Sequence, residues 1–519
     1  MLKKLPIGYS SLQKIVDGQY VYIDKTHHIK HLVDMGSFYF LARPRRFGKS
    51  LLLDTIKQAF LGNKALFTGL YLENHWDWSQ QYPVIHFDFG GGVVHAKREL
   101  DQLVHAMLDH HYRRYNIENL YNEGVNIRLS YLIGAIKARY KKDVVILIDE
   151  YDKPILDNIT DKTKALQMRE CLKNLYGVIK SESNKLQFVL LTGVSKFSKV
   201  NLFSGLNNLS DITLNTYYAD MCGYTQNELE GAFSDYLQDV HLDKLKLWYN
   251  GYNFGGSTAQ KVYNPFDILL FLSHGKQYRN YWFETGSPTF LIKKLAQAPH
   301  QILDYTDVTV SEDLLASFDI DLIPVVTLMF QTGYLTIDQA VDLGGRVGYR
   351  LTYPNLEVKA SIHSHLSRIG SDIEQSNRNI NQLFLALDQA DWQAFERVIT
   401  SLFSSIPHVW YRNNPMSQYE GFYCSIVYSY LLALAYDTVA EDLTQKGQID
   451  LTLKMPNKIV ILEFKIGDSP SAKRALMQIK QKNYAQKYQA LKKPIYLIGI
   501  SFDPVQRNVS NLVWELMPA

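Results

Sequence analysis

The sequence has few cysteines, no long apolar run and no strong charge of one sign. Its three cysteines, Cys171, Cys222 and Cys424, stand singly along 519 residues, so we expect neither a disulfide framework nor a zinc site of paired cysteines. The longer apolar runs, such as 428–436, fall well short of the roughly 18 residues that suggest a membrane span. The amino terminus is interrupted by Pro, Gly and Ser and does not resemble a signal peptide. We therefore expect a cytoplasmic protein with no membrane partner.

Composition and charge do not select one class of function. The net charge of +3 at pH 7 is only mildly positive, which neither requires nor excludes a nucleic acid partner. Hydrophobic residues make up 46% and charged residues 21% of the chain, as is typical of globular proteins. Because 519 residues exceed one ordinary core, we expect two or three domains.

The secondary-structure pattern changes twice along the chain. In the first 220 residues, short apolar runs alternate with helical patterns, which favours a parallel α/β sheet covered on both faces. From about 225 to 400 the pattern becomes mainly helical and indicates a lid and connector. From about 415 a helix, a hairpin, a long helix (471–491) and a strand (495–502) indicate a second α/β unit. The predicted strands of the first sheet are 38–42, 84–89, 144–149 and 188–193. The predicted domains are 1–225, 226–400 and 401–519.

The segment RPRRFGKS (43–50) lies between the first predicted strand and a helix, where a P-loop binds phosphates. In such a loop, Lys49 would contact the β- and γ-phosphates of ATP and Ser50 would ligate Mg²⁺. Arg43 stands where the usual pattern has its first Gly. Gly-Lys-Ser also occurs by chance at helix starts, so this tripeptide alone leaves both interpretations open. The expected ATP-binding residues are Pro44, Arg45, Arg46, Phe47, Gly48, Lys49, Ser50, Leu51, Asp149 and Thr192.

The strand VVILID (144–149) and the following Glu150 supply the carboxylates that a nucleotide site needs. Asp149 would bind Mg²⁺, and Glu150 would orient the attacking water as a catalytic residue. Thr192, which ends another strand and precedes Ser195 and Lys196, is placed to report on the γ-phosphate. A strand that ends in Asp-Glu also occurs where it simply meets a solvated turn. Strand and loop together, in this order, favour ATP binding.

A second cluster of charged residues lies in GQIDLTLKMPNKIVILEFK (447–465), where Asp450, Glu463 and Lys465 form the pattern D-x₁₂-E-x-K. If Pro456 and Asn457 centre the hairpin turn, paired residues have numbers that sum to 913, and Asp450 faces Glu463. Two facing carboxylates repel each other unless a cation lies between them, which predicts a Mg²⁺ or Mn²⁺ site with Lys465 on the same face. A one-residue slip would remove the pairing and leave an exposed polar stripe.

The sequence resembles bacterial AAA-ATPase-like proteins that carry a carboxy-terminal PD-(D/E)XK nuclease-like domain. The resemblance is carried by LPIGYSSLQKIVDGQYVYIDKT (5–26), RPRRFGKSLLL (43–53), IDEYDKPI (148–155) and TGVSKFSKV (192–200). It covers nearly the whole chain and makes Arg43 a family feature. The fold that it implies is an N-terminal P-loop NTPase with a parallel sheet, a helical lid or connector, and a C-terminal restriction-endonuclease-like αβ domain.

The same resemblance extends the carboxy-terminal site. The segment IDL…ILEFK matches the PD-(D/E)XK pattern with its Pro-Asp reduced to Ile-Asp. By analogy Glu420 would be an additional metal ligand, and Gln478 and Tyr484 occupy the helix in which the family has Gln and Tyr. Gln478 would touch the site or the phosphate backbone, or else be an ordinary solvated residue. Gln448 stands where related proteins often carry Arg.

Together these features predict an ATP-regulated, metal-dependent nuclease. DNA is favoured as its substrate because the fold family acts mostly on DNA. The alternative is a nucleotide-dependent switch or scaffold whose nuclease-like domain binds nucleic acid or a protein without cutting. A homo-oligomer is possible, because ATPases of this general type often complete their sites with an Arg from a neighbour.

Overall fold

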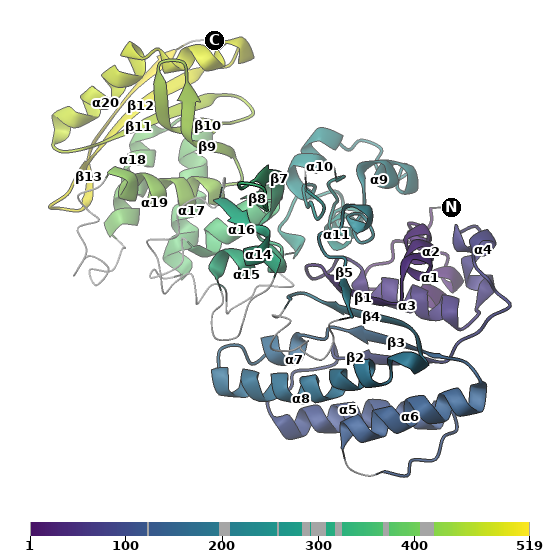
Figure 1. Ribbon diagram of the computed structural model, residues 1–519. Coiled ribbons are helices and arrows are strands. Elements are labelled where there is room, and N and C mark those ends of the chain that lie inside the picture. Colours follow the sequence, from purple (N-terminus) through teal and green to yellow (C-terminus); the bar gives the residue numbers. More distant parts are fainter. Residues whose placement is uncertain are drawn as a thin grey trace. The chain divides into compact units, whose positions relative to one another are not determined.

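The computed structural model describes residues 2–121, 124–196, 208–256, 259–282, 291, 308–316, 324–366, 373–404 and 420–517. The chain divides into two compact units, which Figure 1 colours from purple to green and from green to yellow. The first comprises Met1–Leu291 and Tyr305–Asn355, and the second comprises Ile292–Asp304 and Leu356–Ala519. The division falls inside the region 226–400, and the assignment of three functional domains stays a prediction. No described helix is long and apolar enough to cross a membrane.

The first unit is built on a parallel five-stranded sheet in the order β2-β3-β4-β1-β5. Its strands are β1 (Phe38–Ala42), β2 (Val84–Asp88), β3 (Val144–Asp149), β4 (Leu186–Gly193) and β5 (Ser210–Asp211). The predictions for β1 and β3 are confirmed, and those for β2 and β4 differ by one or two residues at one end. β3 is buried along its whole length, as expected for a parallel strand covered on both faces.

Helices cover this sheet on both sides, with α5, α6 and α8 together on one of them (Figure 1). Their apolar residues recur at helical spacing, and buried Leu129, Leu132, Ile133 and Ile136 of α6 face the sheet side. The helices are α1 (Leu12–Asp17), α2 (Thr26–Met35), α3 (Lys49–Phe60), α4 (Leu72–His75), α5 (Lys97–Arg114), α6 (Val125–Tyr140), α7 (Lys153–Leu156) and α8 (Lys162–Ser181).

The rest of the first unit contains the helices α9 (Gln226–Ala232), α10 (Leu242–Tyr249), α11 (Pro265–Ser273), α14 (Glu312–Ala316) and α15 (Val325–Thr332). It also contains an antiparallel sheet, β6-β8-β7, in a region that the sequence predicted as helical. Its strands are β6 (Val308–Ser311), β7 (Thr336–Asp342) and β8 (Val347–Thr352). Sequence reasoning missed them because β7, TIDQAVD, is half exposed and carries polar residues on both faces.

The second unit contains a mixed five-stranded sheet in the order β13-β12-β11-β10-β9. Its strands are β9 (Asp437–Thr444), β10 (Gly447–Lys454), β11 (Ile459–Ile466), β12 (Ile495–Asp503) and β13 (Asn508–Met517). Only β11 and β12 are parallel. The predicted hairpin and the strand at 495–502 are present, whereas β9 and β13 had no sequence prediction. The helices are α16 (Leu356–Leu366), α17 (Ile373–Gln389), α18 (Trp392–Ser404), α19 (Glu420–Ala433) and α20 (Ser469–Gln481).

The single long helix predicted for 471–491 is wrong. The chain forms α20 and then a 3₁₀ helix, η7 (Tyr484–Leu491). Asn483, between them, adopts the left-handed conformation with φ 51°, which Asn tolerates better than most residues. The break lets Tyr484 and Tyr488 turn into the apolar cluster that α20 and η7 form with Ile459, Ile461 and Leu497.

Candidate nucleotide and nuclease sites

The loop between β1 and α3 turns through two left-handed residues. Arg46 has φ 69° and Gly48 has φ 90°, a conformation that Gly adopts without a steric cost. Gly48 is the amino-terminal cap of α3, and Lys49 is the first residue of that helix. The first backbone N–H groups of α3 therefore face the loop, where they favour an anion.

Arg43, which stands in place of the first loop Gly, is a structural residue. Its side chain is buried, and its guanidinium donates hydrogen bonds to the carbonyls of Ala42, Thr213 and Tyr218 at 2.8–2.9 Å. It also lies over the ring of Phe254, 4.2 Å from the centroid, and burial lowers its pKa to about 10. Arg43 thus ties the start of the loop to residues 213–218 and does not reach toward the phosphate side.

Lys49 lies inside the loop that it would help to charge. Its ammonium donates hydrogen bonds to the carbonyls of Arg43 and Pro44, both at 2.9 Å. Burial lowers its pKa, while the negative charges of Asp149 and Glu150 oppose that effect. The fold therefore brings Lys49 close enough to the carboxylates of Asp149 and Glu150 for their charges to interact.

The end of β3 is fixed by hydrogen bonds to its neighbour β4. The Oδ1 of buried Asp149 accepts from the Thr192 hydroxyl at 2.7 Å and from the backbone N–H of Glu150 at 3.0 Å. Glu150 itself has φ 51°. Burial raises the pKa of Glu150, with Lys49 and Arg45 opposing the rise. Thr192 thus orients Asp149, which is a more indirect role than binding the nucleotide.

A cavity of about 640 Å³ opens along this loop, within the range usual for small-molecule sites. Glu150 lines it together with the expected loop residues Arg45, Arg46, Phe47, Gly48, Lys49, Ser50 and Leu51. Residues far away in the sequence complete its wall, among them Tyr9, Lys25, Tyr224 and Phe266. Pro44, Asp149 and Thr192 are not among the lining residues, although Asp149 directly precedes Glu150, which is.

Sequence reasoning missed Asp152 as part of this centre. Its buried carboxylate accepts from the Ser195 N–H at 2.7 Å, from the Ser195 hydroxyl at 2.6 Å and from the Val194 N–H at 3.1 Å. The neighbouring Lys196 forms an ion pair with Asp211. Ser195 and Lys196, which follow β4, therefore contact Asp152 after β3 and Asp211 of β5, and they do not line the cavity. The third acidic residue in IDEYD was the signal available in the sequence.

In the second unit, the hairpin register predicted from the sequence is confirmed. Leu451 pairs with Leu462 and Lys454 with Ile459, so the paired numbers sum to 913. Beyond the last pair, the Oδ2 of Asp450 accepts from the N–H of Phe464 at 2.7 Å, and the N–H of Asp450 lies 3.5 Å from Oε2 of Glu463. The two carboxylates thus meet at the end of the hairpin ladder.

Both carboxyl groups hold their protons more tightly than usual. Burial raises the pKa of Asp450 to about 6, with Glu420 and Glu441 adding to the effect. Burial and the negative charge of Asp450 raise the pKa of Glu463 to about 7, and the Glu463 side chain is only 1% exposed. A bound cation would stabilise the ionised forms of Asp450 and Glu463 and so offset the cost of burying their charges.

Lys465 lies among the acidic side chains of this cluster. Its Nζ is 3.2 Å from Oε1 of Glu420 and 3.6 Å from Oε1 of Glu463, and it donates to the Phe464 carbonyl at 2.7 Å. Burial opposes its charge, but these carboxylates outweigh burial and raise its pKa. The structure therefore brings Glu420 of α19 to the residues of the hairpin, as the family resemblance implied.

The two residues expected from α20 and its extension behave differently. Gln478 donates a hydrogen bond from Nε2 to Oε1 of Glu463, so it does contact the site. Tyr484 is buried in the apolar cluster beneath η7, with its hydroxyl against Gly447. It shapes the start of β10 and makes no described contact with the carboxylates.

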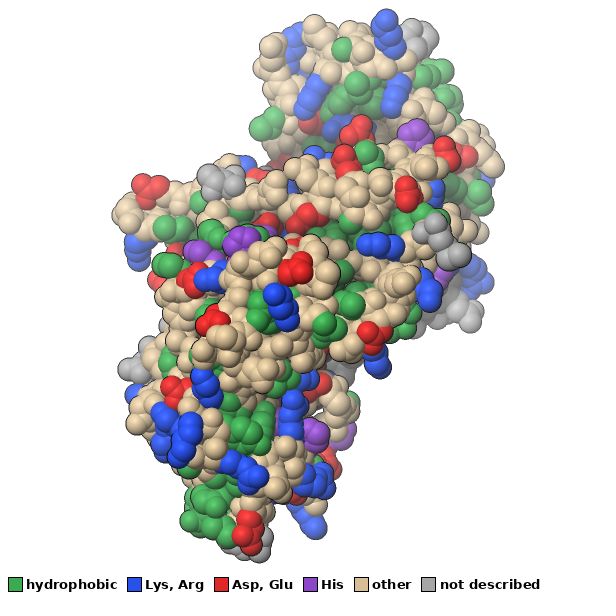
Figure 2. Space-filling view, turned by 90° about the vertical axis from the view of Figure 1, so that its right-hand side faces the viewer, with side chains coloured by type: hydrophobic (Ala, Val, Ile, Leu, Met, Phe, Trp, Pro, Cys, Tyr) green, Lys and Arg blue, Asp and Glu red, His purple; other side chains and the backbone are tan. Residues whose placement is uncertain are grey.

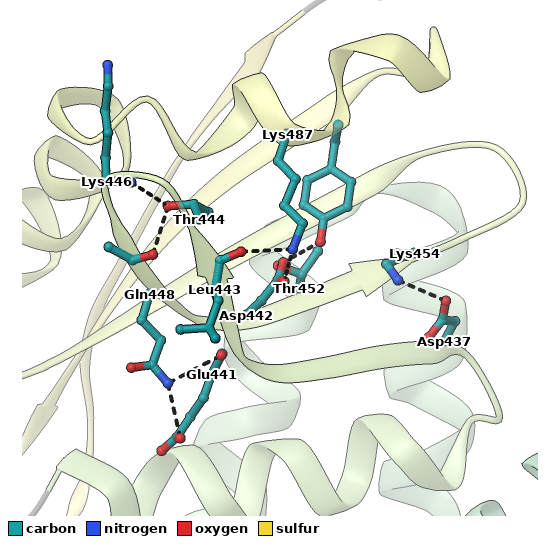
Figure 3. A network of polar contacts seen from close by, with 12 residues as sticks. Asp437, Glu441, Asp442, Leu443, Thr444, Lys446, Gln448, Thr452, Lys454 and Lys487 are labelled. Carbon is teal, nitrogen blue, oxygen red and sulfur yellow. Dashed lines mark hydrogen bonds and ion pairs between the residues drawn. The ribbon is translucent and has the colours of Figure 1, made fainter. Parts of the chain in front are cut away.

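Glu441 of β9 is a further acidic neighbour that sequence reasoning missed. The β9–β10 register pairs Ala440 with Leu451 and Asp442 with Ile449, which places Glu441 opposite Asp450. Its Oε2 accepts a hydrogen bond from Nε2 of Gln448 at 3.0 Å (Figure 3). The tight turn after Thr444 could have supplied this register, had β9 been recognised as a strand.

A separate polar network holds η7 against the hairpin (Figure 3). Buried Asp442 accepts hydrogen bonds from the hydroxyls of Thr452 and Tyr488 and from the ammonium of Lys487. Burial opposes the charge of Asp442, but these donors hold its pKa below the usual value. Because the chain itself supplies these three donors to Asp442, the network stabilises the wall beside the site.

The donor set of the carboxylate cluster fits a divalent cation. Asp450, Glu463 and Glu420 offer hard oxygen ligands, which Mg²⁺ and Mn²⁺ prefer. Within the part of the chain that the structure describes, no three His, Cys, Asp or Glu side chains form a ready metal-binding group. In this arrangement Gln478 and Lys465 both contact Oε1 of Glu463.

Two matches with known family models coincide with these sites. Residues 6–203 match a model described as a predicted AAA-ATPase, and residues 418–512 match that of the PD-(D/E)XK nuclease superfamily. The chain is also similar to an uncharacterized protein in the vnfD 5' region of Azotobacter chroococcum mcd 1. The two are 43% identical over 515 residues, which cover 99% of each chain. The similarity therefore extends over both units.

Proposed function

This chain belongs to the family of predicted AAA-ATPases that carry a PD-(D/E)XK nuclease superfamily domain, and from that premise we propose that it is an ATP-controlled nuclease. In this proposal the first unit binds and hydrolyses ATP, and the second cuts DNA. The observation that carries the nuclease half is the meeting of half-buried Asp450 and buried Glu463 beside Lys465. Two such carboxylates with raised pKa values are costly to retain without a charged ligand.

In the first unit we assign the reaction to the cavity along the β1–α3 loop. Lys49 and the N–H groups at the start of α3 hold the phosphates of ATP. Ser50 and Asp149 would hold Mg²⁺, which neutralises phosphate charge when bound. Glu150 orients the attacking water, and its raised pKa suits a group that draws on a proton of that water.

In the second unit Asp450, Glu463 and Glu420 would hold Mg²⁺ or Mn²⁺. When bound, such an ion activates water and stabilises the charge that grows on the phosphate. Lys465 adds a positive charge next to these carboxylates and is placed to assist at the scissile phosphate. Gln478 orients Glu463 through its hydrogen bond.

The DNA-binding surface is proposed on the exposed face of α20. Arg474 and Lys482 lie one helical turn before and after Gln478 and are exposed, so they share its face. Such side chains would contact backbone phosphates on either side of the cut. Positive and negative side chains are interspersed over the face of the molecule in Figure 2, so local placement supports this assignment better than overall charge does.

Purified protein tests both halves at once. We expect ATP hydrolysis that Lys49→Ala abolishes, and Mg²⁺-dependent cutting of DNA that Asp450→Ala abolishes but Lys49→Ala does not. Replacing Arg98, an exposed residue of α5, by Ala is the matched control and should change neither activity. Absence of cutting on every DNA and RNA form, in Mg²⁺ and in Mn²⁺, would overturn the nuclease half.

A second candidate is a nucleotide-dependent switch whose nuclease-like domain binds nucleic acid without cutting it. The observation that favours it is that Gln478 and Lys465 both contact Oε1 of Glu463, an oxygen that a metal ion would need. In that case DNA binding would be retained while turnover is zero in either metal. Binding and cutting measured on the same DNA therefore separate the two candidates.

A further inference from the structure

We propose that Arg45 stabilises the transferred phosphoryl group from within the same chain, so that the ATPase site needs no arginine from a neighbouring copy. This inference rests on the proposed ATP hydrolysis and names a further catalytic residue for it. It comes from sorting the three arginines of the loop RPRRFGKS by what each side chain contacts.

Each of the other two arginines already has a partner, although Arg46, like Arg45, lines the cavity. Arg43 is buried and bound to three backbone carbonyls. Arg46 lies over the ring of Phe266 at 4.8 Å, against a wall of the cavity that α11 provides. Arg45 is exposed and lines the same cavity, and among the described residues no carboxylate forms an ion pair with it.

The backbone around Arg45 is held by residues far away in the sequence. The indole Nε1 of Trp282 donates to the Arg45 carbonyl at 3.2 Å. Pro44 packs against Gly333 so closely that a Cβ on that glycine would come within 2.8 Å of the proline ring. These contacts fix the part of the loop from which the Arg45 side chain extends, and a fixed starting point favours preorganised catalysis.

Arg45 shares its cavity with the two residues that the proposed hydrolysis uses most directly. Arg45, Lys49 and Glu150 all line it, and Lys49 is the first residue of α3, at the helix end where phosphates would bind. The guanidinium of Arg45 therefore lies along the same cavity in which the γ-phosphate and the attacking water would meet.

The proposed step needs a cation at that place. Water adds to the γ-phosphorus while the bond to the β,γ-bridging oxygen breaks, and that oxygen leaves with the bonding electrons as part of ADP. The proton of the water passes through Glu150 to the inorganic phosphate or to solvent. Negative charge spreads over the γ-oxygens and the leaving oxygen, where a guanidinium is most effective. Loop, carboxylate and arginine all belong to one chain, so the site is complete without a partner.

The test compares the full-length protein with Arg45→Ala, Arg45→Lys and the control Arg98→Ala. We expect Arg45→Ala to lower kcat about 10²- to 10³-fold while the Kd for a fluorescent ATP analogue stays within about threefold. Binding of ADP with aluminium fluoride, which mimics the transferred group, should be lost in Arg45→Ala. Arg45→Lys should restore only part of kcat, because a single ammonium does not match the guanidinium fork.

Mixing variants tests whether the arginine acts within its own chain. Equal amounts of Arg45→Ala and Lys49→Ala should show no more activity than the two separately. Recovery on mixing would overturn the proposal, since it would mean that one chain lends Arg45 to another. An unchanged kcat in Arg45→Ala, in protein whose wild type hydrolyses ATP, would also overturn it. A wild type that neither binds nor hydrolyses ATP would instead refute the proposed ATPase function and the inference with it.

Discussion

At the scale of the residue, Arg43 takes the place of a glycine because other residues of the loop make the turn. A P-loop normally has Gly at this position to permit its turn. Here the turn is made by Gly48 and Arg46, both in the left-handed region, while Arg43 satisfies three carbonyls at the start of the loop. From the sequence it was a departure from a motif, and only the structure shows that it is an anchor.

We predict that Arg43→Gly, which would restore the usual motif, destabilises the protein. It leaves the carbonyls of Ala42, Thr213 and Tyr218 without their donor in a buried place, and such losses cost about 2–5 kcal/mol. Urea unfolding should show a lower free energy of unfolding for the unit that contains Arg43. The control Arg98→Ala should change that free energy by less than about 0.5 kcal/mol. An Arg43→Gly variant as stable as the wild type would contradict the anchoring role.

The carboxylate pair predicts a stabilisation by Mg²⁺ that depends on pH. Asp450 and Glu463 have pKa values of about 6 and 7 in the folded protein, above the usual value of about 4 in the unfolded chain. Their contribution to stability is therefore complete below about pH 4 and is lost as the pH rises through 6 and 7. A bound cation offsets the cost of the two charges.

The increase in Tm on adding Mg²⁺ should therefore grow between about pH 5 and pH 8. Asp450→Asn should remove most of this increase, because it leaves one carboxylate in place of the facing pair. Glu515→Gln, which removes a half-exposed acid that pairs with Lys480, is the matched control and should retain the increase in Tm. A Tm increase that is independent of pH, or that persists in Asp450→Asn, would argue against the site.

At the scale of the element, the hairpin was predictable and its neighbours were not. Pro456 and Asn457 mark a turn and the flanking apolar residues define the strands, so the register of β10 and β11 follows from simple arithmetic. β9 carries five acidic or hydroxyl side chains in DTVAEDLT, and only two of its eight residues are buried. Such an edge strand lacks a clear alternating pattern, and for this reason Glu441 escaped notice.

Helix α5 packs on β2 through a histidine that should make this contact sensitive to acid. His111 is buried, and its Nε2 lies 3.1 Å from the backbone N and 3.0 Å from the carbonyl O of His86. Burial lowers its pKa to about 4, below the unfolded value of about 6.5. The stability contributed by the neutral ring is therefore present above about pH 6.5 and is lost as the pH falls toward 4.

Urea midpoints measured across this range should fall for the wild type and fall less steeply for His111→Gln. His110→Gln, at the exposed neighbouring position of the same helix, should follow the wild type. Identical slopes in all three proteins would show that another group controls the acid response.

At the scale of the whole molecule, the order of the motifs carried most of the prediction. Alternating strands and helices gave the parallel sheet, and the loop 43–50 and Asp149–Glu150 marked the ends of its central strands. The small sheet β6-β8-β7 and the support of the loop by Trp282 and Gly333 could not be predicted, because they depend on contacts between distant segments. The candidate residues of both sites could be named from the sequence, whereas the residues that hold them in place became known only from the structure.

The central claim is that the nucleotide site controls the nuclease site, and DNA cutting measured with and without ATP tests it most directly. The protein should cut DNA in Mg²⁺ at a rate that ATP changes, and Asp450→Asn should not cut under either condition. Lys49→Ala should cut at a rate that no longer responds to ATP, because it cannot hold the phosphates. Cutting that responds to ATP equally in Lys49→Ala, or that survives in Asp450→Asn, would contradict the account.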